Sequence, residues 1–331
     1  LSVLDRTETP MGARLLRQWV LYPLVSKEQI DGRLDAVAGL VGGRAAREEA
    51  SGVLKELCDI PRVVGRVASG HASPRDLASL RRSLELLPTL RELLASSQSD
   101  AVRAQAEDIP DVEEAARIIR EAIVDSPPAT FKSGGVVRDG YSAELDEVRS
   151  VAREGKGWIG KLQAQEREST GIPTIKVGYN KVFGYYHEVT KQHVHLVPDH
   201  RIGKQTLVNA ERNVTPELKE HESRVLTAEE DMLRMEHEIF EDVRRRLAEH
   251  ATTLQDASAA VARIDTLSSL AVVAEESRYV RPEVGDWNEL AIRDCRHPVV
   301  EKLLKGEEFV PNDIAFDAES RQILLITGPN M

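Results

Sequence analysis

The sequence predicts a mainly α-helical fold in which two long antiparallel helices carry a small β-rich module, and an α/β domain begins near the C-terminal end. Three observations predict this fold. Apolar residues recur at helical spacing over most of residues 10–170, alternate with polar residues between 172 and 214, and then return to helical spacing up to about residue 280. The composition agrees, because 30% of the residues are charged and only 4% are aromatic, which favours long exposed helices.

The first half of the sequence is a run of helices whose starts are marked by capping residues. Thr9-Pro10 and Ser73-Pro74 each place an N-cap residue before a proline at the first helical position, and Ser26 with Gln29 forms a capping box. Pro88 is expected to kink or end its helix. A further amphipathic helix is expected over 111–124. The simplest interpretation of this half is a helical core without chemistry.

Two longer helical stretches follow the turn-rich residues 132–141, which predict a short hairpin or loop. The first stretch runs from Ser142 to about Thr170. The second begins at Thr215-Pro216, and no further proline occurs from residue 217 to residue 281. If the second stretch were unbroken, a helix of ~60 residues would be ~90 Å long. Globular helices are much shorter on average, so the two stretches are expected to pair as an antiparallel coiled coil.

The residues between these stretches have the alternation of strands. Strands are expected at 174–179, 185–190 and 205–210, and 180–184 fits a hairpin turn. Beyond residue 279, short strand candidates at 291–293, 309–310, 314–316 and 323–326 predict the edge of an α/β domain.

The final residues, Leu324 to Met331, are an apolar run followed by Gly-Pro-Asn-Met. They match the first four positions of a phosphate-binding loop, G-x-x-x-x-G-K-[ST]. We therefore expect a fragment that stops before the lysine and does not hydrolyse ATP by itself. Gly-Pro-Asn after a strand is also an ordinary turn, and these residues alone do not decide between the two.

Charge is distributed unevenly along the sequence. The net charge is −11, whereas residues 174–213 hold six basic and three acidic side chains. Basic and amide side chains suit phosphate oxygens, so the β-rich module is expected to contact a polyanion. The alternative is a solvated loop region with ordinary lysines. The candidate binding residues are Asn180, Lys181, Lys191, Arg201, Lys204, Gln205, Thr206, Asn209 and Arg212.

No metal site, disulfide or membrane span is expected. His193-x-His195 lacks a cysteine or carboxylate cluster that would complete a metal site. Cys58 and Cys295 lie far apart and imply no disulfide framework. No apolar run approaches the ~18 residues of a membrane span, and there is no secretory signal. A reduced, cytoplasmic setting fits these features.

Four stretches of the sequence carry a more specific signal. They are SVLDRT-x-TPMG-x-RLL at 2–16, GYSAELDE at 140–147, KVGYN-x-V-x-GYY at 176–186 with KQTL-x-NAER at 204–212, and RHPVVE at 296–301 with TGPNM at 327–331. In this order they resemble the MutS family of DNA mismatch-repair proteins. The resemblance covers the whole chain.

The resemblance implies a layout and a function. Residues 1–165 would be a core and first lever, 166–215 a clamp over DNA, 216–280 a second lever, and 281–331 the start of an ABC-type ATPase domain. The clamp would contact duplex backbone without sequence preference, and the levers would couple it to the ATPase. ATP and Mg²⁺ would bind only in the intact parent, which would be a DNA-dependent ATPase. The residues implied for ATP binding are Phe309, Gly328, Pro329, Asn330 and Met331. Phe309 is equally a candidate for a core residue of a strand.

The resemblance also implies partners and leaves alternatives open. The partners would be mismatched double-stranded DNA, a second copy in a homodimer and a MutL-type protein, in a cytoplasmic, nucleoid-associated setting. Arg201, Gly203 and Asn213 stand where the family has other residues, so the resemblance implies the role of the module and does not assign individual phosphate contacts. One alternative is a MutS-family protein that acts on recombination intermediates. The other is an SMC-like structural ATPase arm, although such proteins place the phosphate loop before the coiled coil.

Overall fold

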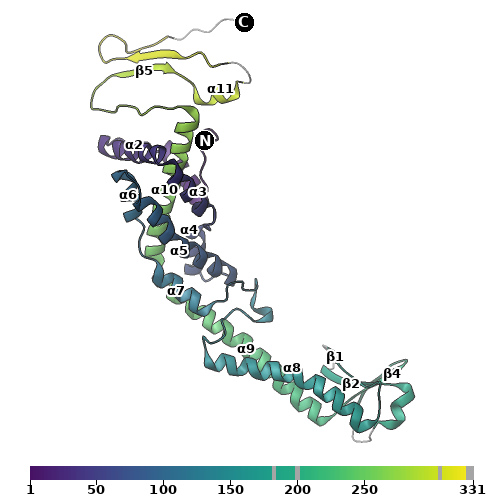
Figure 1. The fold of residues 1–331 in the computed structure, drawn as a ribbon. Coiled ribbons are helices and arrows are strands. Elements are labelled where there is room, and N and C mark those ends of the chain that lie inside the picture. Colours follow the sequence, from purple (N-terminus) through teal and green to yellow (C-terminus); the bar gives the residue numbers. More distant parts are fainter. Residues whose placement is uncertain (181–183, 198–201, 305–307, 326–331) are drawn as a thin grey trace. The chain divides into compact units, whose positions relative to one another are not determined.

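The computed structural model describes residues 1–180, 184–197, 202–304 and 308–325 (Figure 1). Contacts within the chain divide it into two compact units. The first unit comprises Leu1–Ala68, Ser79–Ala116 and Glu249–Met331, and the second comprises Ser69–Ala78 and Arg117–Ala248. Helices α5 (Pro74–Ala95) and α7 (Glu113–Ala122) contribute residues to both units.

The first unit is built around α10 (Ala251–Ser277), whose apolar residues are buried on most sides. Leu254, Val261 and Ile264 are each at most 1% exposed. By length and hydropathy α10 could cross a membrane, which the sequence did not lead us to expect, but 72% of its apolar window is buried within the protein, as in an ordinary core helix. The helices packed against it are α1 (Pro10–Leu21), α2 (Lys27–Gly42), α3 (Arg44–Lys55), α4 (Ile60–Ala68) and α6 (Asp100–Glu107).

A carboxylate of α10 holds the start of α1. Asp265, which is 1% exposed, accepts hydrogen bonds from the backbone N–H of Glu8 at 2.9 Å and of Thr9 at 2.8 Å. It also accepts one from the Thr9 hydroxyl at 2.6 Å, and the same hydroxyl oxygen accepts from Gly12 N at 3.0 Å. Thr9 is therefore the N-cap that the sequence predicts, and Asp265 completes the cap from across the core.

The predicted helix starts at Ser26 and Ser73 are confirmed. Ser26 caps α2 by accepting from Gln29 N, and the Ser73 hydroxyl and Asp76 bond to each other at the start of α5. The expectation that Pro88 could end its helix is wrong, because α5 continues through it to Ala95. Leucines on both sides of Pro88, including Leu84 and Leu90, are at most 1% exposed, and their burial outweighs one missing backbone hydrogen bond.

The last part of the first unit contains a two-stranded antiparallel sheet of β5 (Leu290–Cys295) and β6 (Asn312–Phe316), joined through α11 (Pro298–Leu303). The strand candidates at 291–293 and 314–316 are confirmed. Residues 309–310 and 323–325 are not strands, and residue 326 lies outside the described residues. Val310 and Ile323 are 76% and 90% exposed, so neither segment has the burial that stabilises a strand.

The second unit contains α8 (Ala143–Thr170) and α9 (Pro216–Glu249), which lie side by side (Figure 1). Their pairing is antiparallel, as the sequence predicts, because Arg149 near the start of α8 contacts Glu236, whereas Trp158 stacks on His221 at 3.5 Å. The residues before α8 form a loop rather than a hairpin. It contains a short 3₁₀ helix, η1 (Phe131–Ser133), and a single bridge between Ile123 and Val137.

The proline-free stretch is two helices, not one of ~60 residues. His250 separates α9 from α10 and has φ −91° and ψ 7°, outside the helical region. The two helices also differ in burial, because α9 buries one face whereas α10 is buried over most of its surface. Periodicity alone does not reveal this change of environment.

A four-stranded sheet as the candidate nucleic-acid interface

The β-rich module is a four-stranded antiparallel sheet in the order β1-β2-β4-β3. Its strands are β1 (Lys176–Asn180), β2 (Gly184–Thr190), β3 (Ile202–Thr206) and β4 (Ala210–Val214). The hairpin of the first two strands is confirmed, and its turn residues 181–183 lie outside the described residues. The expected strand at 205–210 is wrong, because the chain reverses inside it.

The reversal is a tight turn in which Leu207 N donates to Ala210 O at 2.8 Å. Asn209 was the residue that could have indicated this turn, because asparagine favours turns. Val208 beside it favours strands instead. The alternation continues from Ala210 to Val214, which forms the fourth strand that the sequence analysis missed.

The sheet has its own small core next to the end of α8. Gly171 ends this helix in the left-handed region, at φ 67°, where glycine is favoured. The chain then buries Ile172 and Ile175 against Val189 of β2, and all three are 0% exposed. The turn after α8 therefore fixes where the first strand begins.

Side chains of both helices bind the backbone of the first hairpin. Gln163 of α8 accepts a hydrogen bond from Val177 N at 3.0 Å, and Glu222 of α9 accepts one from Tyr185 N at 2.9 Å. Arg167 donates to the carbonyl of Ile175 at 3.2 Å. These bonds satisfy backbone groups of the first hairpin and of the residue before it, and they tie the sheet to both helices.

One row of polar side chains crosses all four strands. Lys176 pairs with Glu188, Glu188 with Arg212, and Arg212 with Gln205 in the strand register. Arg212 donates to the Glu188 carboxylate at 2.9 Å and to the Gln205 side-chain oxygen at 3.1 Å. Its guanidinium also lies 4.3 Å above the ring of Tyr186. We call Lys176, Glu188, Arg212 and Gln205 the cross-sheet row.

Four other predicted binding residues lie at the two ends of the sheet. Lys191, Thr206 and Asn209 are exposed at one end, where Lys191 N donates to Asn209 O at 3.1 Å and so joins the 3₁₀ helix η2 (Lys191–Leu196) to the β3–β4 turn. Asn180 lies at the opposite end, next to the first hairpin turn. Lys181 and Arg201 lie outside the described residues, and Lys204 occupies a bulge in β3.

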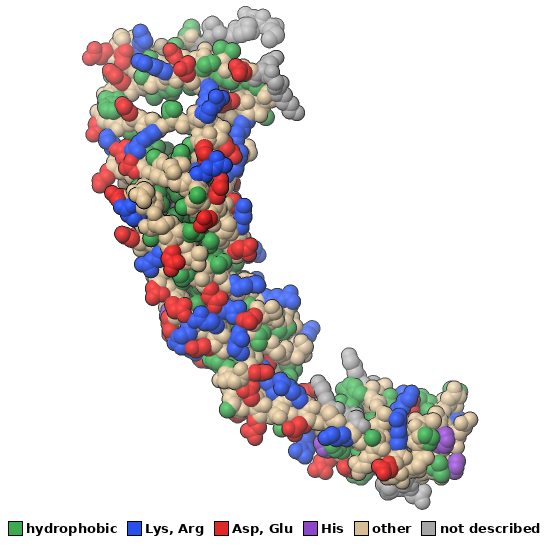
Figure 2. All heavy atoms as spheres, in the orientation of Figure 1, with side chains coloured by type: hydrophobic (Ala, Val, Ile, Leu, Met, Phe, Trp, Pro, Cys, Tyr) green, Lys and Arg blue, Asp and Glu red, His purple; other side chains and the backbone are tan. Residues whose placement is uncertain are grey.

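Figure 2 shows basic and histidine side chains with few acidic ones over the sheet, whereas acidic and basic side chains are mixed over the helices. Arg212 differs from the exposed Lys191, because its side chain is only 19% exposed and is paired with Glu188. Lys191 is thus exposed to solvent, whereas Arg212 holds Glu188 and Gln205 in place within the cross-sheet row.

Comparison with known proteins identifies the family. Residues 1–271 match the family described as MutS domain III. The chain belongs to the MutS family.

Relatives match over essentially the whole chain. It is 47% identical over 331 residues to the DNA mismatch repair protein MutS of Salinibacter ruber, covering 100% of this chain and 36% of the relative. The corresponding protein of Clostridium tetani is 43% identical over 332 residues (100% and 38%), and that of Methanosarcina mazei is 45% identical over 332 residues (99% and 37%). The chain spans little more than a third of the length of these curated relatives. The resemblance seen in the sequence and the mainly α fold are both confirmed.

The MutS resemblance also assigned nucleotide-binding residues. Phe309 lies half-buried between α11 and β6, while Gly328, Pro329, Asn330 and Met331 lie outside the described residues. The described residues therefore do not assemble a phosphate-binding loop. His193 of η2 makes local contacts, because its Nδ1 lies 3.1 Å from the Thr190 hydroxyl and 3.2 Å from that of Thr174.

Proposed function

We propose that this chain forms the core, levers and clamp of a DNA mismatch repair protein, and that its four-stranded sheet is a clamp that binds the backbone of duplex DNA. The observation that carries the proposal is the match to proteins named DNA mismatch repair protein MutS along both the helices and the sheet. The proposed divisions are 1–165 for the core and first lever, 166–215 for the clamp, 216–280 for the second lever and 281–331 for the start of the ATPase domain.

The chemistry of the sheet supports backbone contacts rather than base readout. Lys191, Thr206 and Asn209 are short or flexible exposed donors, which suit phosphate oxygens. Arg212 binds the side-chain oxygen of Gln205, so the amide nitrogen is the end of Gln205 that would donate to phosphate. Asn180, Lys181, Arg201 and Lys204 complete the proposed set.

The remaining parts of the proposal rest on the family alone. In the intact protein, ATP and Mg²⁺ would bind through Phe309 and the residues at 328–331, and the levers would couple the clamp to that site. A homodimer and a MutL-type partner belong to the same proposal.

The test is the salt dependence of duplex binding, measured by fluorescence anisotropy between about 50 and 200 mM salt. Lys191→Ala is expected to weaken binding equally for all sequences and to lower the slope of log K against log salt by about one. Lys132→Ala is the matched control, because Lys132 is an exposed lysine of the same unit outside the sheet, and it should leave the slope unchanged.

Two results would contradict the clamp. One is an unchanged slope after Lys191, Lys204 and Asn209 are all replaced by alanine. The other is a loss of binding in Lys132→Ala as large as in Lys191→Ala, which would place the contacts outside the sheet.

A further inference from the structure

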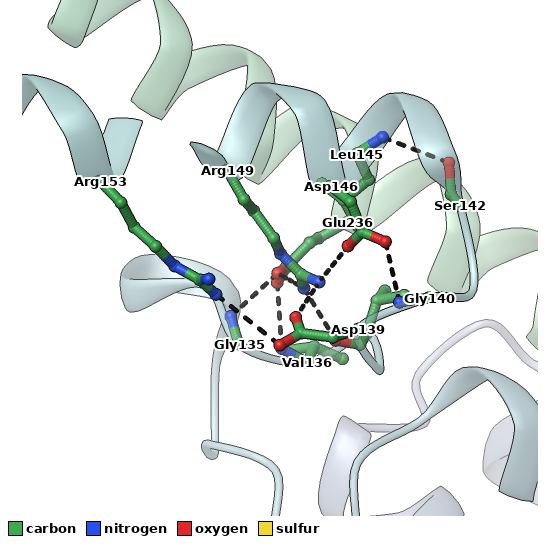
Figure 3. A network of polar contacts seen from close by, with 11 residues as sticks. Gly135, Val136, Asp139, Gly140, Ser142, Leu145, Asp146, Arg149, Arg153 and Glu236 are labelled. Atoms are coloured by element: carbon green, nitrogen blue, oxygen red, sulfur yellow. Dashed lines mark hydrogen bonds and ion pairs between the residues drawn. The ribbon is translucent and has the colours of Figure 1, made fainter. Parts of the chain in front are cut away.

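A buried ion pair joins α8 to α9 (Figure 3). Arg149 lies in the second turn of α8, and Glu236 lies twenty residues beyond the start of α9. The Arg149 side chain is 6% exposed and that of Glu236 is 0% exposed. A charge removed so completely from water is stable only when its partners are fixed, so this contact constrains both helices strongly.

Glu236 is held by the backbone as well as by arginine. Its two oxygens accept hydrogen bonds from the successive N–H groups of Gly135 and Val136, each at 3.0 Å. Gly134 and Gly135 have φ 66° and 82°, and a side chain at Gly134 would displace the end of the Met232 side chain of α9. Successive N–H groups in such a turn form a concavity suited to an anion, and a carboxylate fills it here.

Arg149 ties the same loop to α8. One of its terminal nitrogens donates to Val137 O at 2.7 Å and to Glu236, and the other donates to Asp139 at 2.8 Å. Asp146 in turn accepts from Gly140 N at 2.8 Å. Two helices and the loop before α8 therefore meet in one hydrogen-bonded network, which we call the α8–α9 joint (Arg149, Glu236, Asp139, Asp146 and the backbone of 135–140).

Apolar side chains surround the joint. Val137, Leu145 and Met235 are buried beside it, and Tyr141, Val148, Met232 and Ile239 pack against them. This low-dielectric setting strengthens the pair while both partners are present, and it makes the loss of either one costly.

Between the joint and the sheet, the sequence of α8 becomes rich in glycine. Residues 155–160 read Gly-Lys-Gly-Trp-Ile-Gly, so three glycines fall within six helical positions. Glycine is destabilising inside a helix by roughly 0.5–1 kcal/mol relative to alanine, because it lacks a side chain and gains backbone freedom. A side chain at exposed Gly157 would meet no atom within 4 Å, so packing does not require glycine there.

We propose that the α8–α9 joint is a fixed point about which the sheet-bearing ends of α8 and α9 bend, with Gly157 as the compliant position in α8. Arg149 and Glu236 are then positioning residues for the contact of the sheet with duplex DNA. The DNA part of this inference rests on the proposed function. The bending itself does not depend on it.

The first test measures bending without DNA. Spin labels at exposed Gln192 in η2 and exposed Ala129 in the loop between α7 and α8 give a distance distribution by electron spin resonance. Gly157→Ala should narrow this distribution, because it stiffens α8 without a steric clash. Glu236→Gln should broaden it, because an amide NH₂ group would face a backbone N–H donor. Arg153→Ala is the control, since the Arg153 side chain is 72% exposed and its contact with Asp139, at 3.7 Å, is longer than those of Arg149.

A charge exchange separates this joint from a simple ion pair. In Arg149→Glu with Glu236→Arg the opposite charges remain, but an arginine would face the N–H groups of Gly135 and Val136. We therefore expect the exchange to broaden the distribution as much as Glu236→Gln does. Restoration of the narrow distribution by the exchange would overturn the proposed role of the loop.

The second test measures duplex affinity in the same variants. Glu236→Gln should weaken binding roughly threefold to tenfold, the size expected for a residue that acts through others, while the hydrogen exchange of the sheet stays unchanged. If wild-type protein fails to bind DNA, the proposed function fails but the distances still test the joint. Unchanged distances in both Gly157→Ala and folded Glu236→Gln would overturn the joint. If Glu236→Gln does not fold, Gly157→Ala alone decides.

Discussion

Replacing Asp265 by alanine should destabilise the first unit by removing the acceptor that holds the start of α1. The carboxylate accepts three hydrogen bonds, from Glu8 N, Thr9 N and the Thr9 hydroxyl. Thr9 is 2% exposed, so its two donors would be left without water as well as without Asp265.

The magnitude follows from those two donors. Each buried donor without a partner costs about 1–3 kcal/mol, which gives about 2–6 kcal/mol for Thr9. Alanine also removes a buried charge, and this offsets part of the loss. We expect a net decrease of about 3 kcal/mol in the free energy of unfolding of the first unit.

The assay is urea unfolding followed by tryptophan fluorescence. In a Trp158→Phe background the remaining tryptophans, Trp19 and Trp287, both belong to the first unit. Asp256→Ala is the matched control, because Asp256 is an exposed acid on the same helix, and it should change stability by less than about 0.5 kcal/mol. The reasoning is refuted if Asp265→Ala is no more destabilising than Asp256→Ala.

Two further predictions concern Asp265 and the first hairpin. Burial raises the pKa of Asp265, so the folded state binds its proton more readily than the unfolded state does. The free energy of unfolding of wild type relative to Asp265→Asn should therefore rise as the pH falls from above the raised pKa toward the ordinary pKa of aspartate. A pH-independent difference in urea unfolding across that range would contradict this. Gly184→Ala should speed hydrogen exchange in β1 and β2, because Gly184 has φ 74° and a side chain there would displace Glu222 from Tyr185 N. Gly203→Ala, in open space with ordinary φ, should leave exchange unchanged.

Local signals were the part of the fold that sequence could predict. Thr9, Ser26 and Ser142 cap helices through bonds to residues three positions away, so the information lies within one turn. Pro88 misled because tertiary burial of its leucine neighbours decided the outcome. The β3–β4 turn was missed because it lacks glycine and contains a valine.

The joint was invisible in the sequence for a different reason. Glu236 is one acid among many in α9, and its partners lie 87 and about 100 positions away. Its burial can be inferred only after the loop 135–140 has been placed against α9. For the binding residues, composition indicated the correct module, but only the strand register separated the exposed Lys191 from the internally paired Arg212.

The two outer strands of the sheet, β1 and β3, determine how readily a strand of another chain could pair with it. At β1 the outward N–H of Val177 is occupied by Gln163, and at β3 the bulge between Gly203 and Gln205 interrupts the regular ladder. An open, regular edge recruits strands from other chains. The hydrogen bond from Val177 N to Gln163 and the bulge in β3 therefore leave a less regular edge for a strand of a second chain to pair with.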